Sequence, residues 1–220
     1  MLALRLFPAS AWLADHAWFR PLMKHKIKQS LRYARVVIYK ETLVDFNEHL
    51  WTFLGAFTGI GSIGLIQSYY LSESDNLFLV GSFGATSVLI YGVINSPLAQ
   101  PRNVFGGHIV SAIVGTMVCY FIPTLWLAAA VAVALSIVAM QVTKTLHPPG
   151  GATALIAVIG SEKVKQLGFF YVLNPIASGV TILLLVAMIF NNLTPSRKYP
   201  TNKHWYKVWR RRYLKKHRHH

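Results

Sequence analysis

The sequence predicts an all-α integral membrane protein with about six transmembrane or half-transmembrane helices and strongly basic ends. Of its 220 residues, 54% are hydrophobic and 13% are charged, whereas about 25% of the residues in an average soluble domain are charged. The charge is also unevenly placed. Residues 1–44 hold 8 Lys or Arg and 2 acidic residues, residues 45–193 hold 4 and 5, and residues 194–220 hold 10 and none. A near-neutral hydrophobic domain therefore lies between two basic regions, which excludes a soluble globular domain.

The two basic regions are expected at the cytoplasmic surface of a membrane, where Lys and Arg resist translocation and meet anionic lipid. Residues 1–44 mix basic and apolar residues in the way that is typical of amphipathic helices lying on a bilayer. The C-terminal run from Trp209 to Lys216 interleaves aromatic and basic residues, which is also typical of a nucleic-acid-binding arm. We favour the membrane surface, with no nucleic acid as partner, because the hydrophobic domain already requires a membrane.

Four long apolar segments predict helices that span the bilayer, because about 20 helical residues cross its hydrocarbon core. In the first of them, Gly55 and Gly59 are spaced for close packing against another helix. The last is interrupted at Asn174-Pro175. The four predicted spans are residues 50–71, 104–122, 124–143 and 168–190.

Two further segments are broken or short. Residues 77–94 are apolar but interrupted by glycines, and residues 152–160 are too few to span as a straight helix. An even number of segments places both termini on one side, the cytoplasmic one, in agreement with the basic ends. The acidic loop at residues 72–76 then lies outside. Lys163 and Lys165 also fall outside, a conflict that a re-entrant fifth segment would relieve.

A self-match indicates an internal repeat. Residues 84–89 (GATSVL) recur as residues 151–156 (GATALI), an offset of 67 residues. The same offset pairs Gly107-His108 with Asn174-Pro175, which we expect to be equivalent breaks. Although one short match can arise by chance, both halves also share the order of a span, a broken segment and an interrupted span.

The two halves, residues 50–122 and 124–190, each hold three segments. Because three is odd, the second half enters the membrane from the opposite side. The sequence therefore predicts two inverted repeats, an arrangement that in transporters places the binding site near the midplane between discontinuous segments.

Each half is expected to break at its glycines and to begin a new helix there. The first N–H groups of a helix have no partner within it, and together with the helix dipole they attract an anion. Proline has no N–H group, so the donors of the second half would start at Gly150. Glycine and alanine leave room for a small ligand to approach the backbone. The candidate substrate-binding residues are Ser82, Gly84, Ala85, Thr86, Ser87, Lys144, His147, Pro148, Pro149, Gly150, Gly151, Ala152 and Thr153.

Three ionisable residues at membrane depth are candidates for function, because charge there is expensive. Lys144 follows a long apolar span and is equally well explained as a helix-end lysine that snorkels to the surface. His108 and His147 are candidates for a proton relay, although His147 can also hold the turn and His108 can be interfacial. The apolar segments contain no carboxylate and a single cysteine, Cys119. We therefore expect no metal, no cofactor, no catalytic residues and no enzyme.

Residues 146–155 (LHPPGGATAL) resemble the signature of the HPP family of small membrane proteins. The resemblance covers about residues 45–192 and leaves both basic regions outside it. It implies a membrane protein of bacteria, cyanobacteria or plastids, and some members of the family are reported as nitrite transporters. Nitrite is a small monovalent anion, so this implication agrees with the expected site at the helix ends. The family is often described with four transmembrane helices, and short broken segments would explain the difference from six.

Together these features predict a transporter or channel for a small inorganic anion, with nitrite first and nitrate or formate-like anions behind it. The alternative is a structural or regulatory membrane protein whose basic tails bind lipid. We expect a multi-pass protein of the bacterial inner membrane, with the plastid envelope as the second choice. We also expect a homo-oligomer, with membrane lipids bound at the basic tails.

Overall fold

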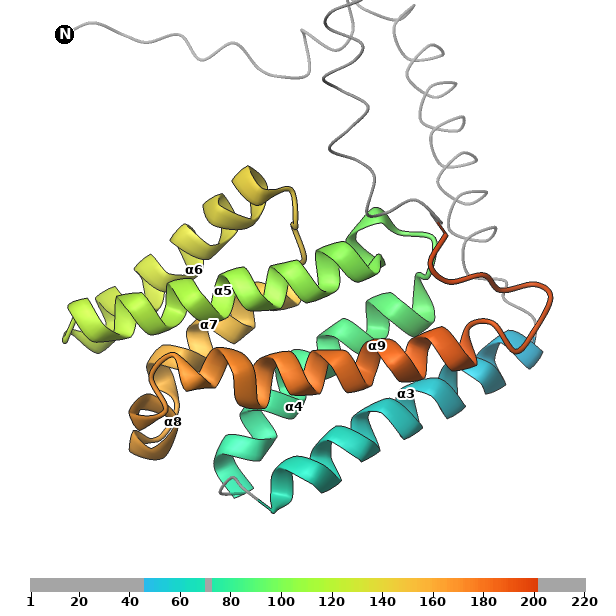
Figure 1. Ribbon diagram of the computed structural model, residues 1–220, viewed down its shortest axis with the longest axis horizontal. Helices are drawn as coiled ribbons and strands as arrows, with labels where there is room; N and C mark the ends of the chain where they lie inside the picture. The colour runs from blue at the N-terminus through green and yellow to red at the C-terminus, as the bar shows by residue number, and fades with distance from the viewer. Residues whose placement is uncertain (1–45, 70–72, 202–220) are drawn as a thin grey trace, which may run out of the picture. The chain divides into compact units, whose positions relative to one another are not determined.

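The computed structural model describes residues 46–69 and 73–201, and within these residues all regular structure is helical (Figure 1). The expected amphipathic region at residues 1–44 and most of the basic tail, residues 202–220, lie outside the described residues. The chain divides into two compact units after Glu48. The second unit, from His49 onward, holds all of the described helices except the first three residues of the first one.

Among the described residues, four helical stretches are long and apolar enough to cross a membrane. Shorter helices lie between them. The long stretches are α3 (Phe46–Ser68), α5 (Pro101–Phe121), α6 (Leu125–Thr143) and the run of π-helix η3 (Val172–Ala177) with α9 (Ser178–Phe190). The shorter helices are α4 (Glu73–Ser87) with its continuation as π-helix η1 (Val88–Gly92), 3₁₀-helix η2 (Pro97–Ala99), α7 (Pro149–Ile159) and α8 (Glu162–Gln166).

The helices run back and forth between two ends of the bundle. At one end, the Thr52 hydroxyl near the start of α3 donates to the carbonyl of Tyr91 at the end of η1. At the other end, Gln67 near the end of α3 bonds the carbonyl of Pro175 near the start of α9. Helix α7 has 11 residues, or about 16 Å at 1.5 Å per residue, which is half of a hydrocarbon core of about 30 Å. The expected short fifth segment is therefore present.

Helices α5, α6 and α7 pack extensively against one another. Small residues allow this close approach. A Cβ atom at Gly115 of α5 would lie 2.5 Å from the carbonyl oxygen of Ala154 in α7, so the two backbones are in contact. A Cβ at Gly107 would lie 2.5 Å from Cβ of His147. The glycines thus draw α7 and the turn before it into the interior of the bundle.

Helix α3 packs through the glycine pair that the sequence singled out. Cβ atoms at Gly55 and Gly59 would lie 2.7 Å and 2.6 Å from the ring and hydroxyl of Tyr91. The prediction of tight helix packing through this pair is confirmed. The opposite face of α3 carries Phe53 and Phe57, which are 63% and 69% exposed. Monomeric soluble proteins rarely leave such apolar surface in water, and a lipid environment accounts for it.

Two of the four predicted helix breaks are wrong. Helix α4 runs without interruption through Gly81 and Gly84, and α5 runs through Gly107-His108. Glycine costs a helix only about 1 kcal/mol, so packing keeps these segments helical. The other two breaks are real: the helix is interrupted between Thr143, where α6 ends, and Pro149, where α7 begins, and Asn174 has the non-helical angles φ −136° and ψ 120°. A residue that precedes proline is pushed toward the extended region, which explains why the chain breaks there.

Residues 194–201, which the sequence places in the basic tail, are held against the bundle instead. Arg197 is buried and donates to Oδ1 of Asn191 (3.1 Å), Oγ1 of Thr52 (2.6 Å) and the carbonyl of Tyr91 (3.0 Å). Tyr199 is also buried, and its hydroxyl donates to the carbonyl of Ala99 (2.6 Å). We call residues 191–201 the C-terminal strap.

Candidate functional site

Five polar side chains meet in the interior, where α4, α5 and α7 come together. Ser82 and Thr86 lie on α4, His108 on α5, His147 in the turn before α7, and Thr153 on α7. None is more than 2% exposed. Burying a polar group is costly unless it is hydrogen-bonded, so this polar cluster needs a complete set of partners.

The polar cluster is joined by short hydrogen bonds. Oγ1 of Thr86 lies 2.8 Å from Nε2 of His108 and 3.0 Å from Nε2 of His147. Oγ1 of Thr153 lies 2.7 Å from Nδ1 of His108 and 2.9 Å from Oγ of Ser82. At the far side, Nδ1 of His147 lies 2.9 Å from the carbonyl oxygen of Leu98. His108 therefore has a threonine hydroxyl at each ring nitrogen.

The contact with Leu98 determines where every hydrogen of the neutral cluster lies. A carbonyl oxygen only accepts, so His147 carries a hydrogen on Nδ1, and its Nε2 must accept from Thr86. Since the single hydroxyl hydrogen of Thr86 is then used, His108 donates from Nε2 to Thr86. Nδ1 of His108 accepts from Thr153, and Thr153 accepts from Ser82. Each donor thus finds an acceptor in one continuous chain from Ser82 to Leu98.

A second arrangement becomes available when His147 carries hydrogens on both nitrogens. Nε2 of His147 then donates to Thr86, whose hydroxyl hydrogen can turn to Nε2 of His108. In this arrangement the hydrogen of His108 lies on Nδ1 and is donated to Thr153. Thr153 turns to the carbonyl of Pro149 (3.4 Å), which also accepts from Ser82 (3.2 Å). Both arrangements leave every donor paired, so the cluster can take up one proton and relay hydrogens between the two imidazoles.

The two imidazoles lie beside each other, and one of them also lies beside a phenylalanine ring. The rings of His108 and His147 have centroids 5.0 Å apart, and the ring of Phe83 lies 5.4 Å from that of His108. The hydroxyl of Tyr171 donates to the carbonyl of Thr153 (3.0 Å). Within the described residues no group of three or more His, Cys, Asp or Glu side chains has the placement of a metal site.

The structure brings together one part of the predicted site. Ser82, Thr86, His147 and Thr153 are in the polar cluster with the relay candidate His108, and Pro149 contributes its carbonyl. Other candidates lie elsewhere. Lys144 is exposed and ends α6 in a left-handed conformation (φ 56°), while Ala85 and Pro148 are also exposed.

The two glycines that were expected to face a shared ligand do not face the polar cluster. A Cβ at Gly84 would meet no heavy atom within 4 Å, and one at Gly151 would meet only Cγ1 of Val133 at 3.9 Å. Gly84 is in mid-helix, so it starts no helix, and Gly151 faces α6. The prediction that these glycines line the site is wrong, because the helix turns that carry them present Ser82, Thr86 and Thr153 inward instead.

The amides at the start of α7 are also engaged. The N–H of Gly150 donates to the carbonyl of His147 (2.9 Å), and that of Gly151 donates to the carbonyl of Pro148 (3.0 Å). The turn through the two prolines thus closes on itself, and these two donors do not form an open anion site. Ala152 is half-buried, and the Ser87 hydroxyl is buried without a hydrogen-bond partner.

The sequence did not predict two members of this region. One is the carbonyl of Leu98, which sets the donor and acceptor roles in the hydrogen bonds of the cluster, and the other is the buried Ser111 on α5. The Ser111 hydroxyl has no hydrogen-bond partner and lies 2.7 Å from where a Cβ of Gly150 would be.

Comparison with known proteins gives one family. A sequence model described as HPP, transmembrane region, matches residues 41–200. A transmembrane protein of Dictyostelium discoideum is 47% identical over 160 residues, which cover 71% of this chain and 51% of that protein. A second transmembrane protein of the same organism is 46% identical over 160 residues, covering 71% and 56%. The chain therefore spans about half the length of these curated relatives. No solved structure matches it significantly.

Proposed function

Because the chain belongs to the HPP transmembrane family, we propose that it carries a small monovalent anion across the membrane together with a proton, with nitrite as the first choice. Nitrate and formate-like anions are the second choice. The observation that carries the proposal is the polar cluster, in which His108 and His147 are fully buried yet have a complete second set of hydrogen-bond partners for an added proton.

The proton and the anion are linked by charge. Within the apolar interior a protonated imidazole is a buried positive charge, and a buried charge is costly unless it is paired. A monovalent anion beside the protonated cluster restores neutrality, so that proton and anion cross as a neutral pair. The closed packing around the cluster means that the helices must part to admit the anion. Its binding groups are then hydroxyls and imidazole N–H groups rather than the backbone amides of α7.

The internal repeat supports a transporter. Thr86 and Thr153 are separated by the repeat offset of 67 residues, and both hydroxyls bond the ring of His108. Each threonine hydroxyl also lies near the carbonyl oxygen four residues earlier, 3.3 Å from that of Ser82 for Thr86 and 3.4 Å from that of Pro149 for Thr153, and these two carbonyls are again 67 residues apart. We propose that residues 50–122 and 124–190 are inverted repeats and that His108 lies where their equivalent second segments meet.

A structural or regulatory protein is the second candidate. It is favoured by the fact that the neutral cluster satisfies all of its own hydrogen bonds, so it needs no ligand to explain it. In that case the basic tails, through lipid contact, would carry the function. In either case we propose a homo-oligomer with both ends on the cytoplasmic side, as the positive-inside rule favours. We propose no enzymatic activity, since the cluster contains neither a carboxylate nor a thiol.

The test is uptake of nitrite by liposomes that contain the purified protein, with a pH gradient that is alkaline inside. We expect uptake well above that of protein-free liposomes, and loss of the excess when the gradient is collapsed. Protein-free liposomes are essential, because nitrous acid itself crosses bilayers. His108→Gln should abolish the excess, while His49→Gln, at an exposed histidine, should retain it. Uptake equal to that of empty liposomes, for nitrite, nitrate and formate alike, would favour the structural candidate.

A further inference from the structure

A groove opens on the outer surface of the bundle, where the start of α5 passes the end of α9 in the opposite direction (Figure 1). Its volume is about 420 Å³. Three of its residues, Phe105, Leu185 and Met188, are 41%, 56% and 36% exposed, so the groove opens toward the lipid around a membrane-spanning bundle. We call it the α5–α9 groove, and its lining includes Arg102, Phe105, Thr145, Thr181, Leu185 and Met188. Neither the proposed transport nor the family match assigns a role to it.

The lining favours an apolar occupant about as large as one acyl chain. The hydroxyl of Thr181 donates to the carbonyl of Ala177 (2.7 Å), and that of Thr145 is paired with the hydroxyl of Thr143 (2.7 Å). Apart from these two threonines and Arg102, the residues of the lining are apolar. An apolar cavity of about 150 Å³ holds the six carbon atoms of benzene. The groove, with about 420 Å³, therefore has room for roughly 17 carbon atoms at the same density.

One end of the α5–α9 groove is positively charged. Arg102 is the second residue of α5, and its Nη2 donates to the carbonyl of Thr143 at the end of α6 (3.3 Å). The exposed Lys144 follows directly. A guanidinium has five N–H donors in a planar fork that matches phosphate. Arg102 can therefore bind a phosphate oxygen while it keeps its bond to α6, and it does so near the end of a span, at the depth of the lipid headgroups.

The two ends of the bundle differ in charge. In the described residues from His49 onward, the acidic residues lie on α4 and α8. Asp75 accepts from the backbone N–H of Ser161 (3.1 Å), which joins the starts of these two helices at one end. The other end, where Tyr199 reaches Ala99, has no acidic residue in the same part of the chain. Its basic residues, which attract anionic lipid, are Arg102, Lys144, Arg197 and Lys198.

A second copy of the chain is the other candidate occupant, and charge argues against it. In a symmetric dimer the same surface of each copy meets itself, so two α5–α9 grooves would bring two Arg102 side chains together. Like charges repel strongly in apolar surroundings, because a low dielectric weakens the repulsion little. An anionic headgroup meets no such penalty. We propose that the α5–α9 groove binds one acyl chain of an anionic phospholipid, whose phosphate is held by Arg102.

The position of the groove connects it to the polar cluster. Thr145 belongs to its wall and precedes His147 by two residues. A Cβ at Gly106 of α5 would lie 2.5 Å from Cγ2 of Thr145, so α5 and the turn before α7 are in direct contact there. A lipid chain in the groove therefore packs against the turn that holds His147 without entering the cluster. Its binding does not depend on the transport proposed above.

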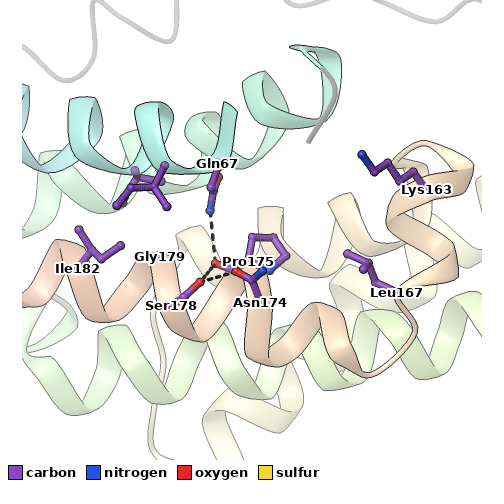
Figure 2. A pocket seen from close by; sticks show the side chains of 10 residues that line it. Gln67, Lys163, Leu167, Asn174, Pro175, Ser178, Gly179 and Ile182 are labelled. Atoms are coloured by element: carbon purple, nitrogen blue, oxygen red, sulfur yellow. Dashed lines mark hydrogen bonds between the residues drawn. The ribbon is translucent and has the colours of Figure 1, made fainter. Parts of the chain in front are cut away.

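A smaller pocket at the opposite end of the bundle supplies a control. Figure 2 shows Lys163 of α8 beside this pocket, which lies between the end of α3 and the kink before α9. It also combines a basic side chain with largely apolar walls. Its volume of about 70 Å³ has room for only about three carbon atoms at the density used above. Lys163→Met thus removes a positive charge from a place where we expect no acyl chain to bind.

The experiment is site-specific photo-crosslinking of the full-length protein. The photoreactive analogue p-benzoylphenylalanine replaces Phe105 in the groove or, as the matched control, Phe53 on α3. Phe53 is 63% exposed and lies next to Thr52, at the same end of the bundle as Arg102. Each protein is reconstituted into liposomes of phosphatidylcholine with a minor share of phosphatidylglycerol that has the same acyl chains. Mass spectrometry then identifies the cross-linked lipid.

We expect the ratio of phosphatidylglycerol to phosphatidylcholine adducts to be about fivefold higher at Phe105 than at Phe53. This factor corresponds to about 1 kcal/mol for one basic residue that meets an anionic lipid. Arg102→Met should lower the ratio at Phe105 to that at Phe53, whereas Lys163→Met should leave it high. Met188→Trp fills the groove and should lower the yield of lipid adducts at Phe105. The yield at Phe53 should stay unchanged in each variant, which shows that the protein is still folded and inserted.

Three results would overturn the proposal. Equal lipid ratios at Phe105 and Phe53 would mean that the groove is covered by the same lipid as the rest of the bundle. Cross-links from Phe105 to a second copy of the chain, in place of lipid, would make the groove a dimer interface. Enrichment that persists in Arg102→Met would assign the selectivity to other basic residues. Because no transport is measured, failure of the nitrite uptake experiment leaves these results unchanged.

Discussion

The hydroxyl oxygens of Thr86 and Thr153 bond opposite nitrogens of one imidazole ring, at 2.8 Å from Nε2 and 2.7 Å from Nδ1 of His108. Each hydroxyl can donate or accept, so both nitrogens of His108 keep a partner in the neutral and in the protonated arrangement of the cluster. The ring therefore stays in position while the nitrogen that carries its hydrogen changes with the protonation of His147. This combination of a rigid ring and a mobile hydrogen is the property from which the first two predictions follow.

Thr86→Val removes the hydroxyl that joins the two histidines while it keeps the shape of the side chain. We expect the free energy of unfolding to fall by about 1–3 kcal/mol for each polar group left unpaired, and proton-linked uptake to be lost. Thr86→Ser restores the hydroxyl and should recover most of both. Thermal unfolding in detergent and uptake into liposomes measure the two effects. If the valine variant is as stable as the wild type, the assigned hydrogen-bond chain is incorrect.

His147→Asn and His147→Gln separate the two bonds of this histidine. The amide of asparagine reaches the position of Nδ1 and retains the donor to Leu98, but it loses the acceptor that faces Thr86. The asparagine variant should fold and carry out uptake that no longer responds to the pH gradient. The glutamine variant loses the bond to Leu98 and should be the less stable of the two. Equal gradient dependence in the wild type and the asparagine variant would remove His147 from the relay.

Gly115→Ala and Gly84→Ala test the packing of α7 in the interior. A Cβ at Gly115 would lie 2.5 Å from a backbone carbonyl of α7, which cannot move aside as a side chain can. We expect a loss of about 1–3 kcal/mol, the usual cost of overpacking. A Cβ at Gly84 meets open space, and alanine suits a helix better than glycine, so this variant should be neutral or slightly stabilised. The melting temperatures of the two variants in detergent provide the comparison.

Arg197→Lys tests the C-terminal strap. The guanidinium donates to three different acceptors in a fixed geometry, which a lysine ammonium does not reproduce. We expect Arg197→Lys to lower the melting temperature almost as much as Arg197→Met does. Lys198→Met, at the next position, is the matched control for the loss of one positive charge. A lysine variant with wild-type stability would show that only the charge matters.

Much of the fold follows from the sequence, because apolar segments of about 20 residues have few alternatives in a bilayer. The four long helices and the short α7 lie where hydropathy predicts them. The breaks predicted at Gly84 and at Gly107-His108 are absent, because glycine permits a helix break without requiring one. Asn174-Pro175 does break the helix, since proline constrains the residue before it.

The site could be predicted only in part. The self-match includes the helix turns that contain Thr86 and Thr153, but it does not say which face of each helix is turned inward. The packing of α4, α5 and α7 determines which face is turned inward, and on that face lie the threonines and not the neighbouring glycines. The contribution of Leu98 is a backbone carbonyl, which no residue type reveals. Gln67 lies in a predicted span that contains no charged residue. Its amide donates to the carbonyl of Pro175, and this bond depends on the kink in a distant segment, which the sequence around Gln67 does not reveal.

The C-terminal strap has a consequence for biogenesis. Thr52 and Tyr91 leave the ribosome early, but their shared partner Arg197 follows the last helix, so the end of the bundle stays open until synthesis has passed that residue. Tyr199 likewise reaches Ala99 only after every described helix, from α3 to α9, has been made. Closing this end is therefore a late step, taken after membrane insertion and not during it. A chain halted after residue 193 would therefore lack the contacts that join Thr52, Tyr91 and Ala99 to the C-terminal strap.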